Sequence, residues 1–163
     1  MRRFLRNICS KIKKSETLGD VVQPNENLAR NLIGGSSSKN LKKLFEPKTE
    51  NIKPSQFFDS RNPKELSVNR ISTLTDAKAH ELGLQLKDEI NAKNPEQLKA
   101  YHGYGKLTVQ ICLDAGCSRV EKEDYKGKKP YHANIIYPAK EKFEEMEIAN
   151  ILAFKAKLFK YNQ

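Results

Sequence analysis

Polar and charged side chains gather at the ends of predicted strands, and their types are those that bind and protonate phosphate groups. A short β-rich run, residues 66–71, contains Arg70, and a second predicted strand, residues 131–137, presents His132 and Asn134 on one face. Arginine holds phosphate oxygens with paired N–H groups, and histidine titrates near neutral pH. Arg and His on neighbouring strands can therefore bind a phosphate and move a proton. The same residues can instead form a hydrogen-bonded sheet edge, and both interpretations stay open.

The most specific expectation concerns the environment of the Arg70 side chain. Alternation along the first strand puts Leu66, Val68 and Arg70 on one face. If the two apolar residues face the core, Arg70 turns the same way, and an arginine there must be paired or must meet a ligand. The opposite register would bury Ile71 and leave Arg70 free.

Two functions from different classes fit these residues. In an enzyme acting on a phosphate or nucleotide, such as a nuclease or nucleotide transferase, Arg70 would hold the anion and His132 would act as general acid or base. Glu65 would be a second acid or base. In a non-catalytic module the region would only recognise the anion. The further binding candidates are Asn134, Asn69, Arg61, Tyr101, Lys128 and Lys129.

Neither a metal nor a cofactor is expected. The chain has no phosphate-binding loop, no dinucleotide glycine fingerprint and no nucleophile elbow. Cys112 and Cys117 would need two further zinc ligands. His102 and His132 could supply them, but buried thiols are the stronger interpretation. Clustered carboxylates suited to magnesium are missing from the strand ends, so any catalysis is predicted to be metal-independent.

Length and charge limit the class of protein and the kind of partner. The 163 residues suffice for one domain, and 30 Lys and Arg against 20 Asp and Glu give a net charge of +10. No apolar run approaches the roughly 18 residues of a membrane-spanning helix, and three cysteines are too few for a disulfide scaffold. These observations predict a cytoplasmic protein with an anionic partner.

The basic excess is greatest at the start of the chain. Residues 1–15 carry six basic and no acidic side chains, with apolar residues at helical spacing, which predicts a basic amphipathic helix. It could be a mitochondrial presequence in a eukaryote, an anchor on anionic lipid or nucleic acid, or a helix packed on the domain. Because residues 34–38 read as a flexible linker, we predict a largely mobile segment over 1–54 and a single domain over 55–163.

The remaining patterns predict an α+β fold with a small antiparallel or mixed sheet covered by helices. A helix is expected after the N-cap Thr75 and up to about residue 92. Alternation predicts a strand over 106–113 with a returning strand over 119–125. The strand 131–137 should be central and covered by a helix over 140–161.

Two of these segments resemble a known pattern. Glu65-Leu-Ser-Val-Asn-Arg70 and Tyr131-His-Ala-Asn-Ile-Ile-Tyr-Pro138, with the Ala-rich helix that follows, resemble small bacterial proteins of unassigned function that share LSV-x-R … HANI-x-x-P. The resemblance covers roughly residues 57–160. It implies a bacterial source, and it implies that Arg70, His132 and Asn134 belong to one shared feature without assigning them an activity.

The first functional hypothesis is a small basic binding module for nucleic acid or a nucleotide, of a kind that would suit a bacterial defence or toxin-type system. It rests on the net charge, the basic segment 126–129 and the nearby tyrosines, since interleaved cations and aromatic rings suit phosphate contact and base stacking. A protein partner and membrane contact through residues 1–15 are further expectations. The alternative is the metal-independent nuclease or transferase that uses Arg70 and His132.

Overall fold

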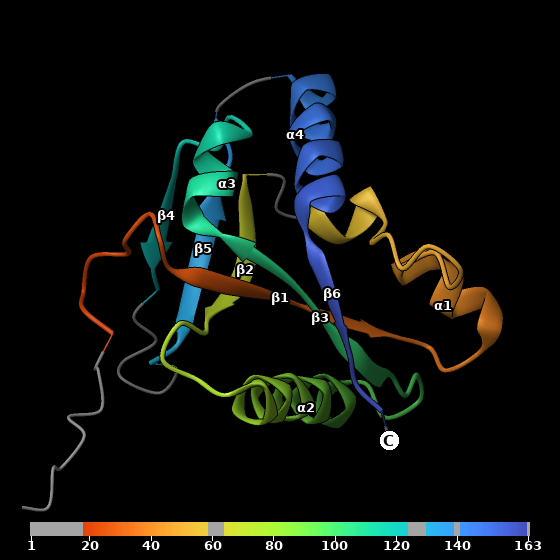
Figure 1. Ribbon diagram of the computed structural model, residues 1–163. Coiled ribbons are helices and arrows are strands. Elements are labelled where there is room, and N and C mark those ends of the chain that lie inside the picture. The colour runs from red at the N-terminus through yellow and green to blue at the C-terminus, as the bar shows by residue number, and fades with distance from the viewer. Residues whose placement is uncertain (1–17, 59–63, 124–129, 139–140, 163) are drawn as a thin grey trace, which may run out of the picture.

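The computed structural model describes residues 18–58, 64–123, 130–138 and 141–162, and its strands form one antiparallel sheet (Figure 1). The strands are β1 (Asn27–Gly34), β2 (Glu65–Arg70), β3 (Ala100–Thr108), β4 (Arg119–Lys122), β5 (His132–Ile136) and β6 (Lys157–Lys160). Their spatial order is β4-β5-β2-β1-β3-β6. The helices are α1 (Ser38–Leu44), the 3-10 helix η1 (Pro54–Phe57), α2 (Asp76–Lys93), α3 (Val109–Asp114) and α4 (Lys142–Lys155). The predicted α+β architecture is confirmed.

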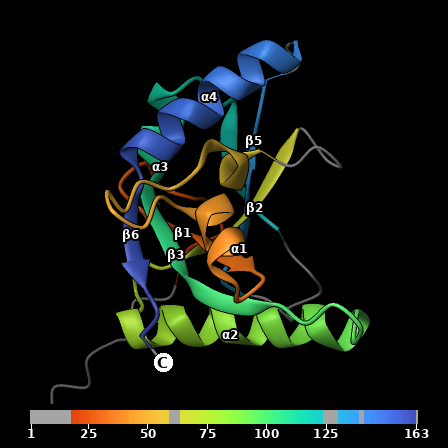
Figure 2. The same ribbon diagram turned by 90° about the vertical axis from the view of Figure 1, so that its right-hand side faces the viewer.

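The two faces of the sheet are covered differently (Figures 1 and 2). One, here called the core face, is covered by α1, η1, α3 and α4. It holds the main apolar core, which includes Leu28, Leu32, Leu66, Val68, Ile135, Cys112 and Leu152. The opposite, here called the α2 face, is covered by α2, and its apolar cluster is small: Ala29, Ile71, Ala79 and Tyr104.

Two local predictions are confirmed. The Thr75 side chain accepts a hydrogen bond from the backbone N–H of Lys78 and caps α2, as its position before Asp76 predicts. β5 lies inside the sheet, paired with both β4 and β2. Ile135 of β5 and Leu152 of α4 are both fully buried in the same core.

Gly83 brings α2 close to the sheet. A Cβ atom at this position would lie 2.2 Å from the ring of Tyr101 on β3. The glycine that interrupts the apolar pattern of the helix is therefore required by packing, because any side chain would push α2 away from β3.

The predicted domain boundary at residue 54 is wrong. β1 pairs with both β2 and β3, and Leu44 of α1 is only 4% exposed. The supposed linker 34–38 is a tight turn, in which Ser37 caps α1 by accepting a hydrogen bond from the backbone N–H of Asn40. Residues 27–54 therefore belong to the domain.

The strand predicted over 106–113 ends at Thr108. The Thr108 side chain accepts a hydrogen bond from the backbone N–H of Ile111 and caps α3, so the chain turns into a helix. Val109 and Cys112, three residues apart, are buried, which is helical rather than alternating spacing. The predicted returning strand is shorter, and as β4 it pairs with β5 instead.

The last predicted helix also ends early, because the residues after Ala156 join the sheet as β6. Phe159 stacks on the Tyr104 ring with a centroid distance of 5.1 Å, and Leu158 packs against the main core. Strand pairing and this packing outweigh the helical periodicity that runs through the segment.

The charge of the described part differs from that of the whole chain. Eleven of the 30 basic residues and three of the 20 acidic residues lie outside the described ranges, which leaves 19 against 17, a net charge of +2. The amphipathic segment 1–15, Arg61 and the basic segment with Lys128 and Lys129 lie outside the described residues. Among the helices described, none has the length and apolar character needed to cross a membrane.

Candidate functional site

A pocket of about 420 Å³ lies on the α2 face, between α2 and strands β1, β2 and β5. Leu82 and Leu86 of α2 line one wall, and Tyr131 lies at the start of β5. The sheet lines the opposite wall with polar side chains: Asn31, Ser67, Asn69 and His132. The pocket thus combines apolar and hydrogen-bonding surface, as sites for small molecules commonly do.

The register of the strands explains why this wall is polar. Asn69 pairs with His132 and Ser67 pairs with Asn134, so these four side chains share the α2 face. Their strand neighbours Leu66, Val68, Ala133 and Ile135 point to the core face and are buried there. The sequence-predicted residues Asn69, His132 and Asn134 are therefore brought together on neighbouring strands.

The wall contains a gap between two strands, and Arg30 lies across it. Backbone pairing between β1 and β2 covers Leu28 with Arg70 and Ala29 with Asn69. Beyond these pairs, Arg30 Nη1 donates to the Ser67 carbonyl at 2.9 Å, and Arg30 Nε donates to the Gln56 carbonyl at 2.8 Å. The guanidinium thus links the two strands and adds a positive charge to the pocket lining.

Glu123 holds the two polar residues of β5. Its Oε2 lies 2.8 Å from His132 Nε2 and accepts a hydrogen bond of 2.8 Å from Asn134 Nδ2. The His132 side chain is 13% exposed and lines the pocket. The contact sets a carboxylate against one ring nitrogen of the imidazole at the pocket wall.

Asn31 supplies an acceptor at the pocket wall. Within the described part of the chain, its Oδ1 atom is buried and accepts no hydrogen bond. Most buried polar atoms in proteins have a partner, because an unpaired one loses its interaction with water. Asn31 thus places a side-chain amide with a spare acceptor among the residues that line the pocket.

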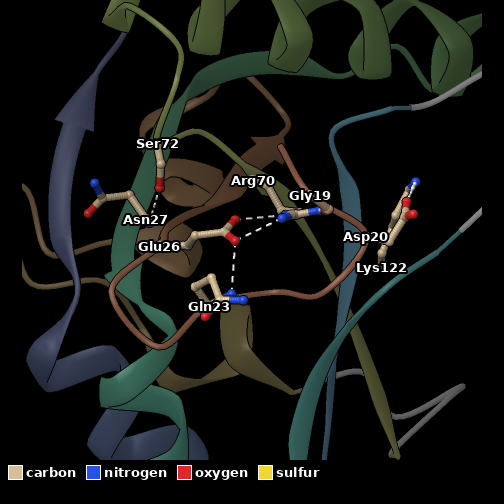
Figure 3. A network of polar contacts seen from close by, with 8 residues as sticks. All are labelled: Gly19, Asp20, Gln23, Glu26, Asn27, Arg70, Ser72 and Lys122. Atoms are coloured by element: carbon tan, nitrogen blue, oxygen red, sulfur yellow. Dashed lines mark hydrogen bonds and ion pairs between the residues drawn. The ribbon is translucent and has the colours of Figure 1, made fainter. Parts of the chain in front are cut away.

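Arg70 occupies a different environment (Figure 3). Its side chain is 0% exposed and makes a bidentate ion pair with Glu26, with two N–O distances of 2.8 Å, while Nη1 donates to the Gly19 carbonyl. Burial alone would raise the pKa of Glu26, but hydrogen bonds from Arg70 and from the Gln23 N–H hold that pKa below its ordinary value. The structure therefore shows that the buried Arg70 is paired with an acidic side chain.

Arg70 and His132 do not share a pocket. Arg70 follows Val68 on the core face, whereas His132 is the register partner of Asn69 on the α2 face. An enzyme using both on one substrate, as the sequence suggests, does not fit this arrangement. Glu65 is exposed at the opposite end of β2.

Tyr101 is buried under α2. Its hydroxyl lies 3.0 Å from His80 Nδ1, and burial raises the pKa of the phenol. Tyr104 is also fully buried, and its hydroxyl donates to Asp76 Oδ1. Neither ring is open to stack on a base, whereas Tyr131 lines the pocket.

The two cysteines near α3 are buried free thiols. Burial raises the pKa of both, to about 12 for Cys117. Over the described ranges, no three His, Cys, Asp or Glu residues group in a way that could hold a metal ion.

Sequence reasoning missed Arg30, Asn31 and Glu123. The first two lie on β1, in a segment assigned to the mobile tail, although Leu28, Arg30 and Leu32 alternate there in a strand-like way. Glu123 follows β4 with no local signal that marks it as the partner of His132.

Comparisons with protein-family models, with curated proteins and with solved structures find no match for this chain.

Proposed function

We propose that the protein is a small binding module that takes a mononucleotide, or an unstacked terminal nucleotide of a nucleic acid, into the pocket between α2 and the sheet. The observation that carries this proposal is the pocket itself, with about 420 Å³ of space, two leucines of α2 among polar α2 residues on one side and a largely polar wall from β1, β2 and β5 on the other. A volume of this order suits one small ligand rather than a duplex.

The chemistry of the two walls suits the two parts of a nucleotide. Leu82, Leu86 and Tyr131 offer surface for a flat ring. The amides of Asn31 and Asn69 present both donors and acceptors, as the edge of a base does. Arg30 adds positive charge for a phosphate, whereas Lys78 is ion-paired with Glu81 and the lining also includes Glu89.

With a net charge of +2, the described residues supply little of the +10 carried by the chain. Extended contact with a nucleic acid backbone would therefore depend on the residues outside the described ranges, and it would weaken steeply with salt.

Calorimetric titration of the full chain with the four common nucleoside monophosphates and with inorganic phosphate tests the proposal. We expect at least one nucleotide to bind more tightly than phosphate. Asn69→Ala should weaken that binding about tenfold, since it removes hydrogen bonds made to the ligand. Asn51→Ala, an exposed asparagine away from the pocket, is the matched control. Absence of binding at millimolar nucleotide, or equal binding by Asn69→Ala and the parent chain, would contradict the proposal.

A second candidate function, cleavage or transfer of a nucleotide phosphate, is favoured by the contact between Glu123 and His132. An imidazole oriented by a carboxylate at a pocket wall has the arrangement of a general acid or base. If the chain turns over a bound nucleotide, His132→Gln should lower the rate about 100-fold or more. Turnover that survives this substitution would exclude His132 as the acid or base.

A further inference from the structure

α4 turns a row of large apolar side chains toward solvent. Phe143 is 70% exposed, Met146 51%, Ile151 43% and Phe154 81%. Only two other large apolar residues of the described part, Val21 and Leu98, are as open, and they lie on different segments. Figure 2 shows α4 along the outer side of the helical layer. Its inner side is already used, because Ile148, Ala149, Leu152 and Ala153 are buried against the core.

The four exposed residues are placed symmetrically about the middle of α4. Phe143 and Phe154 lie equally far from the point between residues 148 and 149, and Met146 and Ile151 do so as well. A two-fold axis at that point would set a second α4 antiparallel to the first. Each Phe143 would then lie level with Phe154 of the second copy, which is how a self-complementary dimer surface is built.

The polar residues of the same face also suit an antiparallel pair. The first half of α4 is acidic, with Glu144 and Glu147, and its end carries Lys155. An antiparallel arrangement places the acidic half of each helix beside the basic end of the other, whereas a parallel one places like charges together. Glu147 would lie level with Asn150 of the second copy, an amide that can donate to its carboxylate. These acidic residues disfavour an anionic lipid surface as the occupant.

We propose that the protein forms an antiparallel homodimer through the exposed face of α4, with Phe143 of each copy packed on Phe154 of the other. The exposed surface of the eight apolar side chains, with aromatic residues that each carry roughly 150–250 Å², comes to about 1,000 Å². This is near the lower limit for a specific interface, so a dimer of micromolar affinity is expected.

Sedimentation of the full chain over about 1–100 μM tests the proposal, a range in which a micromolar dimer dissociates. The parent chain should pass from monomer to dimer across it. Phe154→Lys and Phe143→Glu should each weaken dimerisation by roughly 30-fold or more, as loss of a central aromatic contact does. Leu98→Glu changes an equally exposed apolar residue off α4 and should leave the dimer unchanged. A chain that stays monomeric throughout overturns the proposal.

The double variant Phe143→Glu with Phe154→Lys distinguishes this dimer from other associations. In the antiparallel pair, each introduced carboxylate faces an introduced ammonium of the second copy, so the double variant should dimerise better than either single variant at low salt. A parallel pair would bring like charges together, and another occupant of the face would gain nothing from the second change. A double variant weaker than both single variants overturns the antiparallel arrangement.

Discussion

The side chains of β2 and β5 differ in kind between the two faces of the sheet. On the core face, β2 and β5 contribute Leu66, Val68, Ala133 and Ile135, all buried beneath α-helical cover. On the α2 face they contribute Ser67, Asn69, His132 and Asn134, which stand at or beside a pocket. Because side chains alternate along a strand, one short sequence serves both faces. The contrast predicts that substitutions on the core face change stability and that substitutions on the α2 face change binding.

The largest loss of stability should come from Arg70, a fully buried charged side chain on the core face of the sheet. Arg70→Met removes the partner of a buried carboxylate and should cost about 3–5 kcal/mol in the free energy of unfolding. Urea unfolding measures it. Adding Glu26→Leu removes the uncompensated charge and should recover much of the loss. A single variant as stable as the parent chain would mean that the ion pair does not hold residues 18–27 on the sheet.

Truncation of buried apolar residues should cost slightly less. Leu66→Ala on β2 and Leu44→Ala on α1 should each lower the free energy of unfolding by about 2–5 kcal/mol, because both side chains lie in the same core. Thermal or urea unfolding checks this. A small effect at Leu44 alone would show that α1 contributes little to the stability of the core.

Gly83→Ala tests the contact of α2 with its own face of the sheet. Alanine favours a helix by about 1 kcal/mol over glycine. The added Cβ would nevertheless lie 2.2 Å from the Tyr101 ring, and such overpacking commonly costs about 1–3 kcal/mol. We expect net destabilisation in urea unfolding. Gly19→Ala, where a Cβ meets only open space and one atom at 3.9 Å, should be nearly neutral.

The Glu26–Arg70 pair should also make stability depend on pH. The folded state holds the pKa of Glu26 below its ordinary value near 4.3, so the pair contributes fully above that pH. The contribution is lost as the pH falls below that ordinary value and through the lower pKa of the folded state, where the carboxylate becomes protonated. The parent chain should therefore lose more stability between pH 7 and pH 3 than the double variant Arg70→Met with Glu26→Leu. Equal losses in urea unfolding would contradict the assigned shift.

The smallest effect on stability is expected at Ser67, which is the chain neighbour of Leu66, where a large effect is expected. Ser67 is exposed on the α2 face beside the buried Leu66, and Ser67→Ala should change the free energy of unfolding by no more than about 0.5 kcal/mol. If Ser67→Ala nonetheless weakens nucleotide binding in the calorimeter, this supports the view that the α2 face serves binding and the core face serves stability. A destabilisation as large as that of Leu66→Ala would contradict this contrast between the two faces.

How far the sequence predicts this molecule depends on whether a signal is local. The cap at Thr75 and the alternation of 131–137 are local, and both α2 and β5 follow from them. Along 107–113, apolar alternation predicts a strand, whereas Thr108 can cap a helix. The structure has the capped helix α3 there. The partner of Arg70 is 44 residues away, so no local pattern could separate pairing from ligand binding. Of the pocket residues on the sheet, the sequence predicts only those of β2 and β5, because its patterns place residues 27–34 in the mobile segment.

β6 protects the sheet from pairing with foreign strands. It lies along the outer side of β3, whose nine residues would otherwise present a row of unpaired backbone groups. β6 itself is short and begins and ends with lysine, and Lys160 is held by Glu50. Short, charged edges resist the addition of further strands, whereas a long edge with buried tyrosines and leucine invites it. Local detachment of β6 would therefore expose the edge of β3, which could then pair with strands of other molecules and lead to aggregation.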